Sequence, residues 1–228
     1  MSILTENISL VRQRIDAAAA RYQRPPGSVG LLAVSKTHPA QAIERAHAAG
    51  LDDMGENYLQ EALEKQAQLS HLPLTWHFLG AIQSNKSKAV AEHFAWAHAV
   101  DRLKIARRLS QQRPDDMAPL NICLQVNISG EDSKSGCTPE ELPELARAVE
   151  KLDNVRLRGL MVLPQPSDDF EQQRAAFRQA RQLLESTNAL LATPMDTLSM
   201  GMSGDLEAAI AEGATWVRIG TAIFGARG

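Results

Sequence analysis

The chain has 228 residues, a normal length for one α/β barrel, and its 44% hydrophobic content is enough for a sizeable core. Its 27 acidic and 24 basic residues give a net charge of −3, which offers no basic surface for nucleic acid or an anionic membrane. The N-terminal stretch MSILTENISLVRQRI carries charges and has no long apolar run, so we expect no signal peptide, no membrane span and a cytoplasmic protein.

A helix is expected first, over residues 5–22, and eight short apolar runs with strand character follow it. These runs cover residues 30–35, 51–57, 75–80, 95–101, 120–127, 155–163, 196–201 and 214–220. The second run is weak by strand propensity, and its place in the series is what supports it.

Segments with helical spacing follow these runs. They cover residues 39–50, 58–69, 84–94, 102–112, a segment that starts at Thr138, residues 167–191, and a segment from Ser203 that ends before Gly213. Pro39 and Gly50 give the first of these segments the usual start and end of a helix. We expect Thr138 and Ser203 to be N-caps, because a hydroxyl there accepts a hydrogen bond from a free backbone N–H.

Strands that alternate with helices predict βα units and a parallel sheet. Eight strands are the number that closes a (β/α)₈ TIM barrel, although an open doubly wound sheet has the same alternation. No linker or change in composition divides the chain, so residues 1–228 are expected to form a single domain. The extra N-terminal helix should cover the bottom or the side of the barrel.

Ligands of such barrels bind at the carboxyl ends of the strands, so polar residues that end an apolar run are candidates for the site. Lys36 directly follows the run LLAVS. Partial desolvation there would favour the neutral amine, which can attack an aldehyde. Alternatively, Lys36 only extends its ammonium group from the core into water.

The loop after the seventh run, LSMGMSGD, contains Ser199, Gly201 and Ser203. Small residues let the backbone approach an anion, and free N–H groups at a helix N-terminus favour it. A simple N-cap is the alternative role of Ser203.

Arg218 lies in the otherwise apolar eighth run, WVRIGTAIFG. The period of two places Trp216 on the same face as Arg218. A buried arginine needs an acceptor, which could be a ligand or a carboxylate of another strand. Gly220 and Thr221 follow, and the loops after strands seven and eight often bind phosphate in this fold.

Asn57 in GENY and His77 in WHFLG end or lie within two other runs. His77 alternates with two aromatic residues, so it could equally be a core histidine. Cys123 and Cys137 have no C-x-x-C spacing, and no cluster has metal-ligand spacing, so neither a disulfide scaffold nor a metal site is expected. Serine hydrolase, Rossmann and P-loop motifs are also missing from the sequence.

Six segments together resemble the pyridoxal phosphate homeostasis protein family, whose members are stand-alone relatives of the N-terminal barrel of alanine racemases. The segments are LLAVSKT, GENYLQE, WHFLGAIQSNKS, LRGLMVL, TLSMGMSGDLEAAI and VRIGTAIFGAR. They run in order from about residue 30 to residue 227, which is nearly the whole chain. The combination is very specific, whereas VSK or GENY alone would be weak.

The resemblance implies that the chain binds pyridoxal 5'-phosphate as a cofactor, and that Lys36 matches the lysine that forms the internal aldimine. Arg218 matches the arginine that faces the pyridine nitrogen, and Asn57 and His77 match residues of the cofactor pocket. The segments that match the phosphate-binding part contain Ser199, Met200, Ser203, Gly220 and Thr221.

A cationic arginine at the ring nitrogen disfavours its protonation and so weakens the cofactor as an electron sink. Racemisation also needs an acid–base group on each face of the substrate carbon. In the two-domain alanine racemases that the chain resembles, one of these groups is a tyrosine of a C-terminal domain. This chain ends just after the eighth run, so we do not expect it to supply that tyrosine. Tyr58 lies near the expected mouth, but nothing supports it as a second base.

We therefore expect a non-catalytic protein of pyridoxal phosphate homeostasis, with an amino-acid racemase as the alternative. A Schiff-base aldolase that uses Lys36 is a third reading. The expected protein is a monomer whose partners are the cofactor and apoenzymes that require it. Lys134 is either a solvated surface lysine or a second site that reacts with aldehydes.

Overall fold

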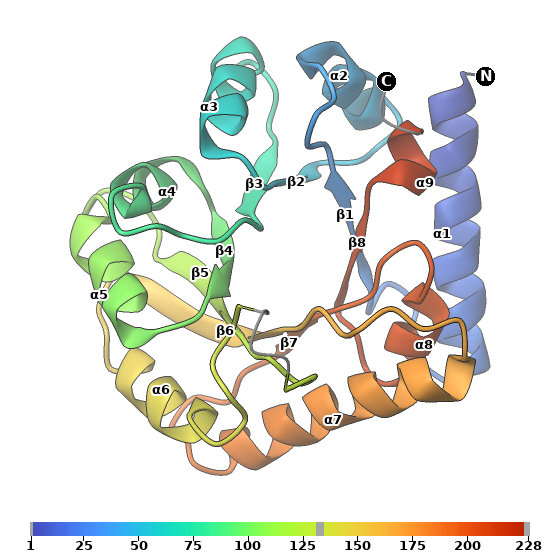
Figure 1. Ribbon diagram of the computed structural model, residues 1–228. Helices are drawn as coiled ribbons and strands as arrows, with labels where there is room; N and C mark the ends of the chain where they lie inside the picture. The colour runs from blue at the N-terminus through green and yellow to red at the C-terminus, as the bar shows by residue number, and fades with distance from the viewer. Residues whose placement is uncertain (1, 131–134, 226–228) are drawn as a thin grey trace.

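The structure is a computed structural model that describes residues 2–130 and 135–225. Eight parallel strands form one closed barrel in which each strand pairs with the next along the chain and the eighth pairs with the first (Figure 1). The strands are β1 (Gly30–Val34), β2 (Asp53–Glu56), β3 (Thr75–Phe78), β4 (Trp96–Val100), β5 (Leu120–Gln125), β6 (Val155–Met161), β7 (Thr197–Ser199) and β8 (Trp216–Ile219). Closure confirms the predicted fold class and excludes the open sheet.

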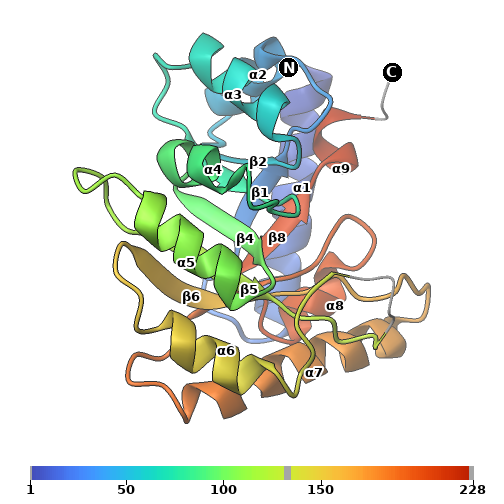
Figure 2. The ribbon, with the colours of Figure 1, turned by 60° about the vertical axis from the view of Figure 1, so that its left-hand side comes forward.

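Helices surround the strands on the outside of the barrel (Figures 1 and 2). They are α1 (Ile3–Arg21), α2 (Ala40–Ala48), α3 (Leu59–Gln68), α4 (Ser87–His93), α5 (Leu103–Gln112), α6 (Leu142–Val149), α7 (Phe170–Asn188), α8 (Leu206–Ala211) and α9 (Thr221–Phe224). The weak second run does form a strand, β2, as its place in the series predicted.

The N-terminal helix α1 covers the side of the barrel. It packs against α8, α9 and α2, and both views show it alongside α9. Since α9 is a single turn, α1 fills the place in the outer ring that a longer helix after β8 would occupy. Its buried side chains form one stripe at helical spacing that includes Ile8, Val11 and Ile15.

Four helices begin at least three residues later than the sequence suggested, and one of them is α4, which begins at Ser87 instead of residue 84. Helix α6 begins at Leu142, but Thr138 and Glu141 exchange side-chain and backbone hydrogen bonds in the turn before it, which is the capping-box pattern. The Leu142 N–H group bonds to the Thr138 carbonyl, so Thr138 caps the turn that leads into α6. Helix α7 has Asp169 as its N-cap, and the side chain accepts a hydrogen bond from Gln172 N–H. Helix α8 has Asp205 as its N-cap, so the expectation that Ser203 caps this helix is wrong.

Aromatic and polar side chains meet inside the barrel. The His77 ring stacks on Trp96 with a centroid distance of 5.4 Å and an interplanar angle of 5°, and Trp216 packs edge-on against both. Trp216 thus shares the barrel interior with Arg218, whereas Val217 and Ile219 belong to the apolar core, which confirms the predicted alternation in β8.

Both cysteines are buried and form no disulfide. Burial raises the pKa of the Cys123 thiol to about 12 and that of Cys137 to about 12, so both thiols are protonated at neutral pH. Within residues 2–130 and 135–225, no helix combines the length and the apolar character needed to cross a membrane.

Candidate functional site

A cavity of about 400 Å³ opens at the carboxyl ends of the strands. The predicted site residues that line it are Lys36, Asn57, Ser203, Arg218, Gly220 and Thr221. They come from the ends of β1, β2, β7 and β8, so the closed barrel brings together side chains that lie far apart in the sequence. Apolar side chains complete the wall: Val34, Leu79, Met161, Leu163 and Met202.

Three other predicted residues do not line this cavity and lie fully buried beneath it. Ser199 and His77 belong to a hydrogen-bonded chain inside the barrel, described below. The Met200 side chain packs in the hydrophobic core, and its backbone N–H bonds to the Trp216 carbonyl. The structure therefore brings these three near the site without placing their side chains in its wall.

Lys36 follows β1 and is half-buried in the cavity wall. Its ammonium group makes no hydrogen bond or ion pair with residues 2–130 or 135–225, so no contact within the described chain occupies it. The position, at the point where an apolar strand ends inside a concave site, suits a lysine that reacts with a ligand.

Asn57 follows β2 on the same side of the cavity. Its side-chain oxygen Oδ1 is buried and has no hydrogen-bond partner in the described chain. Such an atom is costly to bury, so it indicates a polar ligand group or water at this point. Gly80 makes the approach of β3 to Asn57 feasible, since a Cβ atom at residue 80 would lie 2.1 Å from the Asn57 carbonyl oxygen.

Ser203, Gly204 and Thr221, from the loops after β7 and β8, also line the cavity and have free backbone N–H groups. None of the three makes a hydrogen bond to the part of the chain that the structure describes. Asp205 holds the loop in this shape by accepting a hydrogen bond of 2.6 Å from Met202 N–H. Free backbone N–H donors beside a cavity can hold an anionic group such as phosphate.

Arg218 forms part of the cavity floor and is buried. Its guanidinium group donates to Ser199 Oγ at 2.9 Å and to the Val162 carbonyl at 3.0 Å. Burial lowers the pKa of Arg218 to about 10, and the nearby Asp205 opposes this shift. The group stays cationic at neutral pH, and within the described chain its direct acceptors are a hydroxyl and a carbonyl rather than a carboxylate of another strand.

A chain of hydrogen bonds runs from Arg218 through the barrel interior. Ser199 Oγ lies 2.8 Å from His98 Nδ1, and His98 Nε2 lies 3.0 Å from His77 Nδ1. His77 Nε2 then lies 3.1 Å from Asp53 Oδ1. The Asp53 carboxylate can only accept, so His77 carries its proton on Nε2. In neutral rings His77 Nδ1 then accepts from His98 Nε2–H, and His98 Nδ1 accepts from the Ser199 hydroxyl, whose oxygen accepts from Arg218.

Both histidines in this chain are fully buried. Burial is the main cause that lowers the pKa of His77, although its bond to Asp53 raises it in part. Burial lowers the pKa of His98 further, and the charge of Arg218, together with that of His77 whenever His77 is protonated, acts in the same direction. Burial thus favours the neutral form of both rings, the form for which these donor directions hold.

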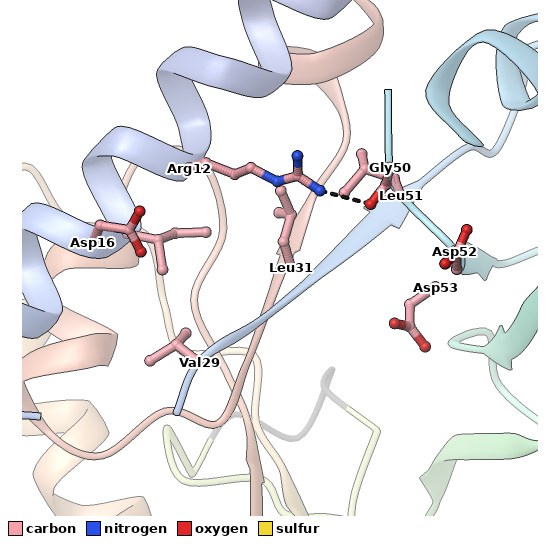
Figure 3. A pocket seen from close by; sticks show the side chains of 9 residues that line it. Arg12, Asp16, Val29, Leu31, Gly50, Leu51, Asp52 and Asp53 are labelled. Carbon is pink, nitrogen blue, oxygen red and sulfur yellow. Dashed lines mark hydrogen bonds between the residues drawn. The ribbon is translucent and has the colours of Figure 1, made fainter. Parts of the chain in front are cut away.

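Asp53 connects this chain to a second, smaller cavity at the other end of the barrel. Figure 3 shows Asp52 and Asp53 on one side of this cavity and Asp16 of α1 on the other. Arg12 reaches across from α1 and donates to the Gly50 carbonyl at 2.6 Å, which fixes α1 against the end of α2. The cavity thus lies where the N-terminal helix joins the barrel.

His98 and Asp53 were missed in the sequence analysis, and a signal for His98 was present. His98 lies two residues after Trp96 in the run AWAHAVD, and His77 lies between two aromatic residues in the preceding run. Two adjacent strands with inward-facing histidines predict a buried polar contact. Lys134 lies outside the described residues.

The lining groups define the chemistry that the site can carry out. Lys36 offers an amine for an aldehyde, the N–H groups of Ser203, Gly204 and Thr221 offer donors for an anion, and Arg218 offers a donor for a ring nitrogen. A phosphorylated aldehyde with a nitrogen-containing aromatic ring carries the groups that match these three. The unpartnered Asn57 oxygen can accept a hydrogen bond from one further donor of the ligand.

Comparison with known proteins gives relatives along the whole chain. A family model described as the alanine racemase N-terminal domain matches residues 6–228. A protein of Pseudomonas aeruginosa named pyridoxal phosphate homeostasis protein is 65% identical over 227 residues, covering 100% of this chain and 97% of that protein. A protein of the same name from Escherichia coli strain K12 is 52% identical over 232 residues, covering 100% of this chain and 98% of that protein.

Solved structures agree with this result. PipY of Synechococcus elongatus with pyridoxal phosphate bound has a TM-score of 0.86 and 41% identity, covering 97% of this chain and 100% of that chain. An alanine racemase of Clostridium difficile has a TM-score of 0.74 at 13% identity, covering 96% of this chain and 56% of that chain. At that identity the similarity concerns the fold alone.

Proposed function

Since the chain belongs to the alanine racemase N-terminal domain family, we propose that its mouth cavity holds pyridoxal phosphate on Lys36 and that the protein serves in pyridoxal phosphate homeostasis. One observation carries the proposal: the unpaired amine of Lys36 shares a cavity with free N–H donors for a phosphate. The relatives named pyridoxal phosphate homeostasis protein, and PipY solved with pyridoxal phosphate, support it.

Each lining residue has a role in this proposal. The neutral amine of Lys36 adds to the aldehyde carbon, and loss of one water molecule leaves a carbon–nitrogen double bond, with no change in oxidation state. The N–H groups of Ser203, Gly204 and Thr221 would hold the phosphate, and Asn57 would accept a hydrogen bond from a polar group of the ring. Ser199 would act through Arg218, to which it is bonded.

Arg218 limits the chemistry that the bound group can support. When bound, pyridoxal phosphate supplies an electron sink whose strength depends on a protonated ring nitrogen. A guanidinium group has donors and no acceptor, so it can bond only to an unprotonated ring nitrogen. Arg218 would therefore favour holding the cofactor over chemistry that needs a fully developed carbanion.

The make-up of the cavity wall supports a carrier over a racemase. Racemisation needs two acid–base groups, one on each face of the reacting carbon. Among the described residues that line the cavity, Lys36 and Arg218 are the ionisable ones. Tyr58, the tyrosine near this end of the barrel, is more than half exposed and does not line the cavity.

Borohydride trapping tests the anchor. The protein is incubated with pyridoxal phosphate, reduced with borohydride and digested, and the modified lysines are identified by mass spectrometry. We expect the adduct on Lys36, loss of the yellow colour in Lys36→Ala, and wild-type labelling in Lys88→Ala, whose side chain is 69% exposed on α4. A colourless wild-type protein with no adduct on Lys36 would refute the proposal and leave the sugar-aldolase reading.

Amino-acid exchange tests the absence of racemase activity. The loaded protein is incubated with single enantiomers of amino acids in deuterated water, and α-proton exchange is followed by NMR. Exchange with inversion at the rate of an enzyme would assign a racemase. No exchange beyond the rate of free pyridoxal phosphate is expected.

Delivery of the cofactor to apoenzymes, a monomeric state and a cytoplasmic location stay predictions. Transfer is tested by comparing the rate of activation of an apoenzyme with the rate at which the cofactor leaks into buffer. Faster activation than leakage is the expected result, since direct delivery bypasses the free aldehyde.

Sedimentation equilibrium tests the predicted monomeric state, and cell fractionation tests the predicted cytoplasmic location.

A further inference from the structure

Lys36 lies in a tight turn whose geometry is unfavourable for its sequence. Residues 35–38 form a four-residue turn that is closed by a hydrogen bond of 3.1 Å from His38 N–H to the Ser35 carbonyl. Thr37 has a φ of +67°, in the left-handed region that favours glycine or asparagine and disfavours a β-branched residue. Something outside the turn must therefore hold Lys36 and Thr37 in this conformation.

Two side chains of α3 hold both ends of this turn. Glu61 Oε1 accepts a hydrogen bond of 2.5 Å from Thr37 N–H, on the carboxyl side of Lys36. Lys65 Nζ donates to the Ser35 carbonyl at 2.7 Å, on the amino side. Lys65 also joins these two contacts, because its ammonium group lies 2.6 Å from Glu61 Oε1.

Glu56 of β2 completes the cluster. Its Oε1 atom accepts hydrogen bonds from Lys65 Nζ at 2.7 Å and from the Ser35 hydroxyl at 2.6 Å. The Glu56 side chain is fully buried and that of Lys65 is 6% exposed, so the pair is shielded from water and from screening by salt. Every backbone bond of this cluster is made to a residue directly beside Lys36.

We propose that Glu61 and Lys65 are positioning residues that lock the turn at residues 35–38 and so aim the Lys36 amine into the cavity. The inference rests on the proposed function for the identity of the ligand. It gives a role to a buried ion cluster that makes no contact with Ser203, Gly204 or Thr221. It also accounts for the positions of the three residues, because Glu56 at the end of β2 and Glu61 and Lys65 one turn apart on α3 all reach the same turn.

The choice of variant decides whether a test is informative. Removing Lys65 would leave Glu56 buried without its cation and could unfold the protein. Glu61 is the better target, because its side chain is 28% exposed and the pair between Lys65 and Glu56 survives its removal. Glu61→Gln keeps an oxygen that can accept from Thr37 N–H, and Glu64→Ala removes an exposed carboxylate of the same helix as a matched control.

Two ligands separate the aiming of Lys36 from the shape of the cavity. Pyridoxal phosphate needs the Lys36 amine, whereas pyridoxine phosphate has an alcohol in place of the aldehyde and cannot react with it. We expect Glu61→Ala to weaken pyridoxal phosphate binding about tenfold, because small misplacements of a reacting group carry costs of this order. Pyridoxine phosphate should bind this variant within about twofold of wild type, and Glu61→Gln and Glu64→Ala should bind both ligands as wild type does.

Amide hydrogen exchange reports on the turn without any ligand. In the wild-type protein Thr37 N–H should be protected by Glu61, and Glu61→Ala should exchange this proton about tenfold faster or more. Thr37→Asn provides a further control, since asparagine adopts the left-handed region more readily than threonine. In that background the loss of Glu61 should weaken pyridoxal phosphate binding less than it does in the wild-type chain.

The outcomes separate this inference from the proposed function. A wild-type protein without an adduct on Lys36 refutes the proposed function. The positioning role is refuted if Glu61→Ala loses affinity for both ligands equally. It is also refuted if this variant keeps its affinity for pyridoxal phosphate while Thr37 N–H exchanges faster. Both results leave the proposed function intact.

Discussion

Single residues set the charge pattern inside this barrel. The Asp53 carboxylate can only accept hydrogen bonds, so with neutral rings it fixes the proton positions of His77, His98 and Ser199 up to Arg218. The two histidines must stay neutral to relay these bonds, and burial favours the same state by lowering the pKa of each ring. The arginine at the cavity floor and the carboxylate at the far end are thus connected through uncharged groups.

Acidification should therefore destabilise the protein. The pKa of His77 and that of His98 are lowered by burial below 6.5, so below that pH the unfolded chain binds more protons than the native protein. We expect the free energy of unfolding to fall between about pH 6.5 and pH 5.5, by up to about 1.4 kcal/mol per pH unit for each histidine. Urea titrations at a series of pH values measure it.

Matched variants can show that the loss of stability on acidification comes from the barrel interior. His98→Asn should make the free energy of unfolding depend less on pH, because one buried titrating group is lost. His93→Asn should leave this dependence unchanged, because His93 is exposed. The pKa of Glu56 is raised by burial, so its titration changes stability in the opposite direction, mainly nearer the pKa of an ordinary glutamate. A free energy of unfolding that stays constant between about pH 7 and pH 5.5 would contradict the charge states derived for the histidines.

At the scale of elements, buried charges join neighbouring parts of the outer ring. Glu212 at the end of α8 is 3% exposed and pairs with Arg174 at 2.8 Å and Arg178 at 3.0 Å, both on α7. Its other oxygen lies 3.3 Å from Arg181 on the same helix. One carboxylate thus fixes the register of α7 against α8, whose preceding loop lines the cavity.

Removing this carboxylate should cost much more than removing an exposed one. We expect Glu212→Ala to lower the free energy of unfolding by about 2 kcal/mol, because three guanidinium groups lose an acceptor that is shielded from water. Glu185→Ala should cost less than about 0.5 kcal/mol, because Glu185 is 60% exposed and pairs with Arg181 at 3.5 Å. Chemical denaturation compares the two variants, and similar losses would show that Glu212 does not join the helices.

Most elements could be predicted from the sequence, because apolar periodicity and flanking glycine or proline residues are local signals. Helix starts were less predictable, since Ser203 has the same side-chain chemistry as a true N-cap. In the folded chain Thr138 does cap the turn that leads into α6, whereas Asp205 takes the N-cap position of α8. Those choices depend on where the following helix must pack, which no local pattern contains.

At the scale of the whole molecule, the barrel and the outer ring share one large hydrophobic cluster, beside a small second cluster around Trp96 and Met161. Buried side chains of α1 belong to the same cluster as those of the strands and the other helices. The hydrogen bonds from Arg12 to the end of α2 and from Arg14 to Glu207 of α8 connect α1 with its neighbours on both sides. The predicted single domain over residues 1–228 therefore implies a single unfolding unit.

Two probes can test this cooperativity. Trp96 and Trp216 lie inside the barrel, so tryptophan fluorescence reports mainly on the strands, while far-ultraviolet circular dichroism reports mainly on the outer helices. We expect both signals to change together in one urea transition, because neither layer can bury its apolar face alone. Helix loss at lower urea than the fluorescence change would show that α1 or another helix unfolds separately.

The sequence by itself determined the alternation of strands and helices and the position of Lys36 at a strand end, because these are properties of adjacent positions, and closure of the barrel was left to the tertiary structure. Only the tertiary structure decided which side chains meet. It placed Asn57, Ser203 and Arg218 around the Lys36 cavity, and it moved His77 and Ser199 beneath that cavity into the chain that ends at Asp53. Closing the barrel sets these distances, because it joins β8 to β1 and turns inward side chains of distant strands towards a common interior.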